Sequence, residues 1–191
     1  SVGCFSLMLV IIIKVNPVNF DPLIGKTFRN NLMRNGEFDK SGVSTSGVTP
    51  KWTFTTGAAI TSSPVVVNGV LYIGSDDKKI YALNANTGAQ IWSYLTGDAV
   101  RSSATITGDS LFIGSNDGYL YCLKTTDGSL IWKKKAYISC SVKACPTVAY
   151  NTVFATWHGM FETTNTVGLD IKTGNEKWRY RRVRANEGAF T

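Results

Sequence analysis

The chain has 191 residues, a formal net charge of +7 at pH 7, four cysteines and a single histidine. This length is typical of one domain, and a hydrophobic fraction of 43% is sufficient for a substantial core. The cysteines and the histidine lack metal-ligand spacing, and neither a nucleophile motif nor a phosphate-binding loop occurs, so the motifs argue against a metalloenzyme, a hydrolase and a nucleotide-binding enzyme.

Residues 1–15 form an apolar leader, with an unbroken hydrophobic run at 7–13. The run is shorter than the roughly 20 residues that span a bilayer. It matches the apolar core of a secretory signal, although a basic segment before it and a cleavage site after it are missing. Its β-branched residues also suit a buried strand. A signal or membrane-anchor remnant, a buried strand and an accidental leader all stay open, and residues 16–50 are predicted to be an irregular connector rich in proline and glycine.

An eleven-residue stretch recurs three times in the rest of the chain, at Ala82–Trp92, Cys122–Trp132 and Gly168–Trp178. Each copy has a polar residue at its third position, a glycine at its seventh and a tryptophan at its end. Asn or Asp can bind the backbone two residues on, and glycine accepts a positive φ, so the pattern predicts a hairpin with the tryptophan on the returning strand. Trp52 ends a fourth, incomplete copy.

The segments between these hairpins also repeat. Residues 62–75 match residues 102–115 position for position, and residues 144–157 keep the pattern before an insertion at about 158–165. A period near 40 residues with four short strands per period indicates propeller blades. The expected strands lie at 63–68, 70–74, 79–83 and 90–95; at 103–107, 110–114, 119–123 and 130–135; and at 145–150, 152–157, 166–170 and 176–181. Residues 51–55 are predicted to add an outermost strand before the first complete blade.

This combination of repeats resembles the pyrroloquinoline-quinone-like (PQQ-like) β-propeller repeat family over residues 51–191. The resemblance implies an all-β propeller of four-stranded antiparallel blades, of which three are complete here. Closed rings of this repeat need about six to eight blades. We therefore expect the chain to be a piece of a longer propeller, and we expect an isolated chain to depend on a longer chain or a complex for its stability.

Ligands of propellers usually bind where the loops between blades meet the central channel. The weak candidates at that face are Thr61, Arg101 and Lys143, with Thr191 at the same repeat position; solvated loop charges are the simpler interpretation of the two cations. Asp76, Asp77, Asn116 and Asp117 lie in nearby turns but are too scattered to predict calcium. His158, in the insertion, has no paired Cys or Asp nearby and is expected to be a loop residue.

Cys140 and Cys145 are close enough in sequence for a loop disulfide, and two buried free thiols are the alternative. The resemblance implies a disulfide between adjacent cysteines in dehydrogenases of the family, and this chain has no such pair. Basic runs at 133–135 and 177–184 are expected on outermost strands, where charge discourages edge pairing, rather than as a nucleic-acid site.

The sequence thus predicts a non-catalytic scaffold for protein partners in a larger assembly, without a cofactor, and outside the cytoplasm. The resemblance implies a role comparable to the propeller lipoprotein of the bacterial outer-membrane assembly machine. The alternative is part of a PQQ-dependent alcohol or sugar dehydrogenase, using PQQ with calcium, whose active-site residues lie outside this chain. Membrane association through the N-terminal apolar segment stays open.

Overall fold

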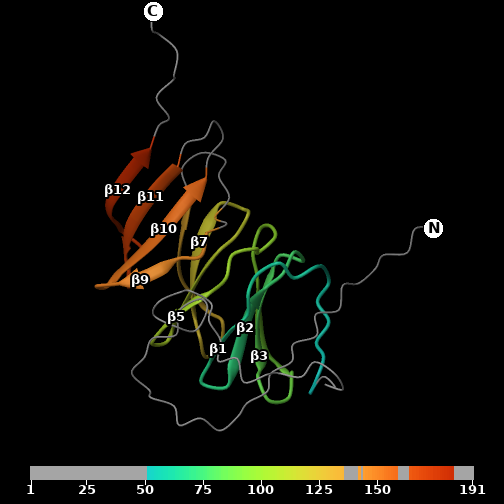
Figure 1. Ribbon diagram of the computed structural model, residues 1–191. Coiled ribbons are helices and arrows are strands. Elements are labelled where there is room, and N and C mark those ends of the chain that lie inside the picture. Colours follow the sequence, from blue (N-terminus) through green and yellow to red (C-terminus); the bar gives the residue numbers. More distant parts are fainter. Residues whose placement is uncertain (1–50, 136–141, 143, 159–163, 183–191) are drawn as a thin grey trace, which may run out of the picture.

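The computed structural model describes residues 51–135, 142, 144–158 and 164–182. These residues form twelve strands and no helix, arranged in three four-stranded antiparallel sheets (Figure 1). Each sheet is a simple meander in which strands that follow one another in the chain are hydrogen-bonded neighbours. The expected all-β, bladed architecture is therefore confirmed, and we refer to the sheets as the first, second and third blade. No helix in the described ranges has the length and the apolar character to cross a membrane.

The strand bounds follow the predicted repeat closely. The first blade contains β1 (Val65–Val67), β2 (Val70–Gly74), β3 (Lys79–Asn84) and β4 (Gln90–Leu95). The second contains β5 (Thr105–Thr107), β6 (Ser110–Gly114), β7 (Tyr119–Lys124) and β8 (Leu130–Lys135). The third contains β9 (Thr147–Ala149), β10 (Thr152–His158), β11 (Thr164–Asp170) and β12 (Glu176–Arg182).

Local sequence chemistry sets the turns. Asn68 and Gly69 both have positive φ, 51° and 76°, as a tight two-residue hairpin turn requires. In the turn between the third and fourth strands, Asn84 Oδ1 accepts hydrogen bonds from the backbone N–H groups of Asn86 and Thr87, at 2.9 and 3.0 Å. Asp170 binds the equivalent backbone groups of Lys172 and Thr173 in the third blade. In the first and third blades the polar third position of the repeat therefore stabilises the turn that the pattern predicts.

The hydrophobic core lies between the blades. One cluster joins the first and second blades and includes Trp92 and Tyr121, and another joins the second and third blades and includes Trp132 and Trp157. Trp92, Trp132 and Trp178 occupy matching places on the outermost strands β4, β8 and β12, which confirms the predicted equivalence. Trp92 and Trp132 pack against the next blade, whereas Trp178 is 42% exposed.

The prediction of a strand at 51–55 is wrong, because these residues have no strand assignment. A strand requires a hydrogen-bonded neighbour, and among the described residues none pairs with this segment. The side chains nevertheless occupy the expected place: Trp52, Phe54 and Ile60 pack against the first blade, around Leu71 and Tyr81. Residues 51–60 thus cover one face of the first blade, and we call them the strap.

The insertion in the third blade lengthens a hairpin instead of forming only a loop. β10 and β11 pair from Thr152↔Asp170 as far as His158↔Thr164, whereas the equivalent pairing in the first blade stops at Gly74↔Ile80. His158 is therefore the last residue of β10, and the expectation that it lies in a loop is wrong. The added pairs join residues 156–158 of β10 to residues 164–166 of β11.

Candidate functional site

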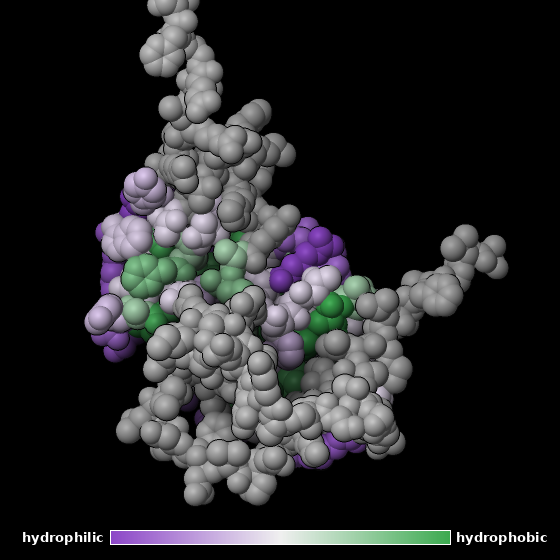
Figure 2. All heavy atoms as spheres, in the orientation of Figure 1, coloured by the Kyte–Doolittle hydropathy of each residue, from purple (hydrophilic) through white to green (hydrophobic). Residues whose placement is uncertain are grey.

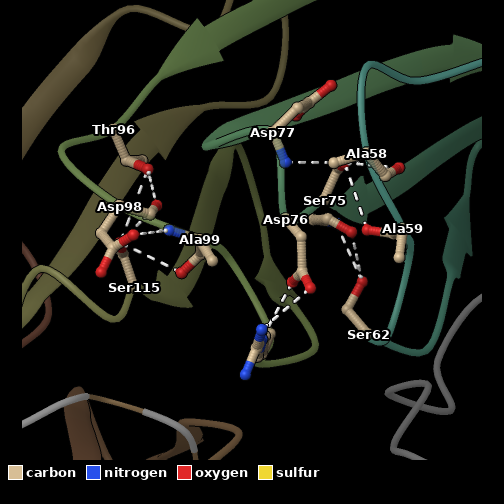
Figure 3. A network of polar contacts seen from close by, with 12 residues as sticks. Ala58, Ala59, Ser62, Ser75, Asp76, Asp77, Thr96, Asp98, Ala99 and Ser115 are labelled. Atoms are coloured by element: carbon tan, nitrogen blue, oxygen red, sulfur yellow. Dashed lines mark hydrogen bonds and ion pairs between the residues drawn. The ribbon is translucent and has the colours of Figure 1, made fainter. Parts of the chain in front are cut away.

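The candidate site is the face where the turn between the second and third strands of a blade meets the segment leading into a blade. Figure 3 shows this region for the first two blades. The centre of each turn is a serine with no exposed surface, Ser75 or Ser115. The backbone N–H of the residue two positions later donates a hydrogen bond to each serine hydroxyl, at 3.2 and 3.3 Å. The backbone carbonyls of the lead-in segments, including Ala58 and Ala59, lie within bonding distance of these hydroxyls. The loops are therefore joined by buried polar contacts.

Two of the turn carboxylates are committed to the fold. Asp117 Oδ2 accepts hydrogen bonds from the Tyr121 hydroxyl at 2.6 Å and the Gly97 N–H at 2.7 Å, while its Oδ1 accepts one from the Tyr119 N–H at 2.9 Å. Asp77 makes the same three contacts, with Tyr81, Gly57 and Lys79. A carboxylate with this many internal donors has little capacity left for a metal or a ligand.

The motifs considered above do not predict this arrangement, although the sequence contains a signal for it. In both blades an aspartate precedes a tyrosine by four residues, and a glycine lies 20 residues before the aspartate. This spacing places the aspartate carboxylate in the turn beside the tyrosine hydroxyl on the following strand. The N–H group of the lead-in glycine donates to the same carboxylate.

The tyrosine hydroxyls give a prediction about alkaline pH. Burial, followed by the hydrogen bond and the charge of Asp77 or Asp117, raises the pKa of Tyr81 and Tyr121 above the ordinary value of 10.0. Above about pH 10 the unfolded chain releases protons that the folded chain still holds, so folding stability is complete below pH 10 and falls as the pH rises beyond it. Urea midpoints measured between pH 8 and pH 11 should show this decline.

Substitution of Tyr121 by Phe should reduce the slope of that decline, because the group that titrates has been removed. Tyr150 is 97% exposed, so Tyr150→Phe serves as the control and should leave the slope unchanged. An equal slope in the wild type and in Tyr121→Phe would contradict the prediction.

Arg101 is exposed but already has an anionic partner. Its Nε and Nη2 atoms donate to the two carboxylate oxygens of Asp76, at 2.9 and 3.0 Å, which gives a bidentate ion pair between the second and the first blade. The hydrogen bond and charge of Asp76 raise the pKa of Arg101 above its ordinary value. The pair lies at the surface, with 48% of the Arg101 side chain exposed, so its contribution to stability is small.

The other predicted site residues are only partly brought together. Thr61 is exposed beside the buried Ser62, whose hydroxyl bonds to both the N–H and the C=O of Gly74. Lys143 and Thr191 lie outside the described residues, as does Cys140, so the predicted disulfide with Cys145 cannot be placed. Cys145 itself is exposed. Cys122 is fully buried, and burial raises the pKa of its thiol to about 12, so it remains protonated at neutral pH.

Within the described ranges, no group of three or more His, Cys, Asp or Glu side chains is arranged to hold a metal ion. The basic residues of the outer strands are also engaged locally. Lys133 and Lys135 lie over the Tyr119 ring, at 4.9 and 5.6 Å from its centroid, and Lys177 lies 3.3 Å from an Asp170 carboxylate oxygen. These three lysines lie on the outermost strands β8 and β12, where the basic runs are expected.

Two family models match the chain. Residues 95–189 match the model described as outer membrane protein assembly factor BamB, and residues 44–107 match the β-propeller domain of glucose/ethanol/alcohol dehydrogenases. No curated protein sequence matches the chain.

Solved structures similar to this chain include both kinds of protein. BamB from Moraxella catarrhalis has a TM-score of 0.57 and 24% identity, covering 68% of this chain and 39% of that one. Quinohemoprotein alcohol dehydrogenase from Comamonas testosteroni has a TM-score of 0.60 and 23% identity, covering 65% and 21%. A europium-containing methanol dehydrogenase has a TM-score of 0.61 and 24% identity, covering 68% and 26%.

The chain therefore spans 39% or less of the length of these structures. Structural similarity at this level of identity establishes the fold, and the two family models identify the repeat. The repeated blades, the conserved geometry of their turns within the chain, and the two matches lead to one assignment. The chain belongs to the PQQ-like β-propeller repeat family.

Proposed function

We propose that this chain is a non-catalytic β-propeller scaffold that binds protein partners within a larger assembly outside the cytoplasm. The observation that carries the proposal is the commitment of the turn carboxylates: Asp77 and Asp117 each accept three internal hydrogen bonds, and Asp76 pairs with Arg101. The match of residues 95–189 to an outer membrane protein assembly factor supports both the scaffold role and the location. No nucleic-acid partner is proposed.

The second candidate is part of a PQQ-dependent alcohol or sugar dehydrogenase, favoured by the match of residues 44–107 to a dehydrogenase propeller domain. A quinone site needs cations for the carboxylates of the quinone and oxygen ligands for its metal. The described residues do not fit this requirement, because their turn carboxylates bind donors of the protein itself and the guanidinium of Arg101 is held by Asp76. The dehydrogenase alternative therefore relies on residues outside the described ranges.

Titration calorimetry with PQQ and calcium separates the two proposals. We expect no binding heat with the wild-type chain. The Asp76→Asn variant removes the anion that holds Arg101, and we expect it to bind no better, because no metal ligands become available. Lys172→Ala, an exposed change in a turn of the third blade, is the control.

Micromolar binding by the wild type that is lost in the Arg101→Ala, Lys143→Ala double variant and kept in Lys172→Ala would overturn the scaffold proposal. That result would establish these two cations as the ligands of the quinone carboxylates.

A further inference from the structure

The outermost strands of the three blades differ in charge, although they hold matching positions in the repeat. β8 ends in three consecutive lysines, and β12 has the sequence EKWRYRR. In contrast, β4 has the sequence QIWSYL and contains no charged residue. Figure 2 shows hydrophilic residues along the margin of the third blade, where β12 lies. Of the three described outer strands, β4 alone therefore lacks the charges that keep strand edges apart.

The uncharged strand β4 also has a free side. It is the last strand of its sheet, and among the described residues only β3 pairs with it. Alternate backbone N–H and C=O groups of such a strand point away from its own sheet and are able to bind a further strand. We call this free side the β4 edge. It offers backbone donors and acceptors without charged side chains around them.

Two large apolar side chains on β4 are exposed to solvent. Ile91 is 48% exposed and Leu95 is 66% exposed, and Ser93 lies between them on the same face of the strand. Trp92 and Tyr94 point to the other face, where both pack against the second blade. The exposed apolar groups are therefore placed symmetrically, two positions on either side of a small serine.

This arrangement is complementary to a second copy of itself. In antiparallel pairing about a twofold axis at Ser93, Ile91 of each copy lies opposite Leu95 of the other, and the two serines meet at the axis. Both exposed apolar side chains thereby gain an apolar neighbour on the opposite strand. The bulge in the pairing of β3 with β4 falls at Ile91, the last residue of this match, so it does not interrupt the residues between.

The equivalent pairing of the other outer strands brings like charges together. At the matching position of β8, Lys133 would face Lys133 of the second copy. In β12 the residue at the axis would be Arg179. Like charges directly opposite each other destabilise a sheet. Among the described outer strands, self-pairing is therefore suited to β4 only.

We propose that the β4 edge is an interface between two copies of the chain, which pair antiparallel about a twofold axis at Ser93 and join their first blades into one continuous sheet. A twofold contact uses the same surface on both copies, so the association stops at the dimer. The occupant is a second copy and not an acidic partner, because the edge has no charge that would attract one. The interface lies on the outer side of the first blade, away from the loops of the candidate site, so the inference does not depend on the scaffold proposal.

Sedimentation equilibrium of the full chain tests this interface. We expect a monomer–dimer equilibrium whose dissociation constant rises about fivefold in Ser93→Lys, because two lysines then meet at the axis. Ser129→Lys adds the same charge at an exposed position in a turn of the second blade and should leave the dissociation constant unchanged. Each copy carries a net charge of +7, so raising NaCl from about 50 to about 500 mM should screen the repulsion and tighten the dimer.

Two double variants test the register of the pairing. Ile91→Lys, Leu95→Lys places like charges opposite each other at two positions and should abolish the dimer. Ile91→Lys, Leu95→Glu places a lysine opposite a glutamate at the same two positions and should still dimerise. Both side chains are exposed in the wild type, so the variants should keep their fold, which circular dichroism checks.

Ser93→Cys provides an independent measurement. Directly opposite residues of antiparallel strands have Cα atoms about 4.5–5.5 Å apart, which is within the range of a disulfide. In a chain that also carries Cys145→Ser, oxidised glutathione should convert this variant to a covalent dimer linked at position 93, and Ser129→Cys should react far more slowly.

A chain that stays monomeric at the highest concentrations used in sedimentation would overturn the inference. A dimer that responds equally to Ser93→Lys and Ser129→Lys would also overturn it. So would a monomer in which the outward N–H groups of β4 are protected from hydrogen exchange, because another segment of the chain would then occupy the β4 edge.

Discussion

Replacement of Trp92 by alanine is expected to lower the free energy of unfolding by about 3–5 kcal/mol. Trp92 is 7% exposed, lies against the Gly128 turn and donates a hydrogen bond to the Thr125 carbonyl, so its loss removes a large buried ring and leaves that carbonyl only the longer hydrogen bond from the Tyr72 hydroxyl. The loss of stability is large because the cavity opens between two sheets. The hydrogen bonds within each sheet keep its backbone from moving in to fill that cavity. Urea denaturation followed by circular dichroism measures the effect.

Trp178→Ala is the matched control, because Trp178 occupies the same position in the repeat. Its ring is 42% exposed and its indole N–H has no acceptor among the described residues, so the same substitution should cost well under half as much. Equal losses for Trp92→Ala and Trp178→Ala would show that the tryptophans act within their own blades and not between blades.

The second large effect is expected for Asp117→Asn, which should lower the free energy of unfolding by about 1–3 kcal/mol. The carboxylate receives donors on both oxygens, from Tyr121, Gly97 and Tyr119. An amide has almost the same shape but only one acceptor oxygen, so its NH2 group must face at least one of these donors. The loss is therefore one of hydrogen-bond matching and not of packing.

Asp109→Asn is the control for that substitution, since Asp109 is an exposed aspartate in a turn of the same blade. The change in charge is identical, and we expect it to have almost no effect on the urea midpoint. A similar loss in both variants would assign the effect to net charge and would contradict the proposed role of Asp117.

These polar contacts explain why two turns that contain several carboxylates need not be ligand sites. Asp77 and Asp117 hold the lead-in segment against the turn of their own blade, while Asp76 reaches Arg101 of the next blade. The first contact sets the position of a loop within a blade, and the second joins neighbouring blades. A scaffold benefits from both, because a binding surface built from loops needs those loops to keep their positions.

The sequence by itself determined the strands, their order and their turns, because the information is local and repeated. Asn68 with Gly69 defines a hairpin, and the polar third position with the glycine four residues later defines another. Three copies of one pattern give the three tryptophans matching positions on the outermost strands. Period-two alternation and turn chemistry act over a few residues, and such signals can be read directly from a sequence.

Only the tertiary structure decided what those equivalent residues contact. The pairing of Asp76 with Arg101 and the place of Trp52 against Gly88 join residues 25 and 36 positions apart, so they depend on how blades approach one another. For the same reason residues 51–55 pack like an outer strand without being one, since a strand exists only where a hydrogen-bonded neighbour exists. Identical positions in a repeat have identical local preferences, but the neighbouring blade decides which tryptophan is buried and which remains exposed.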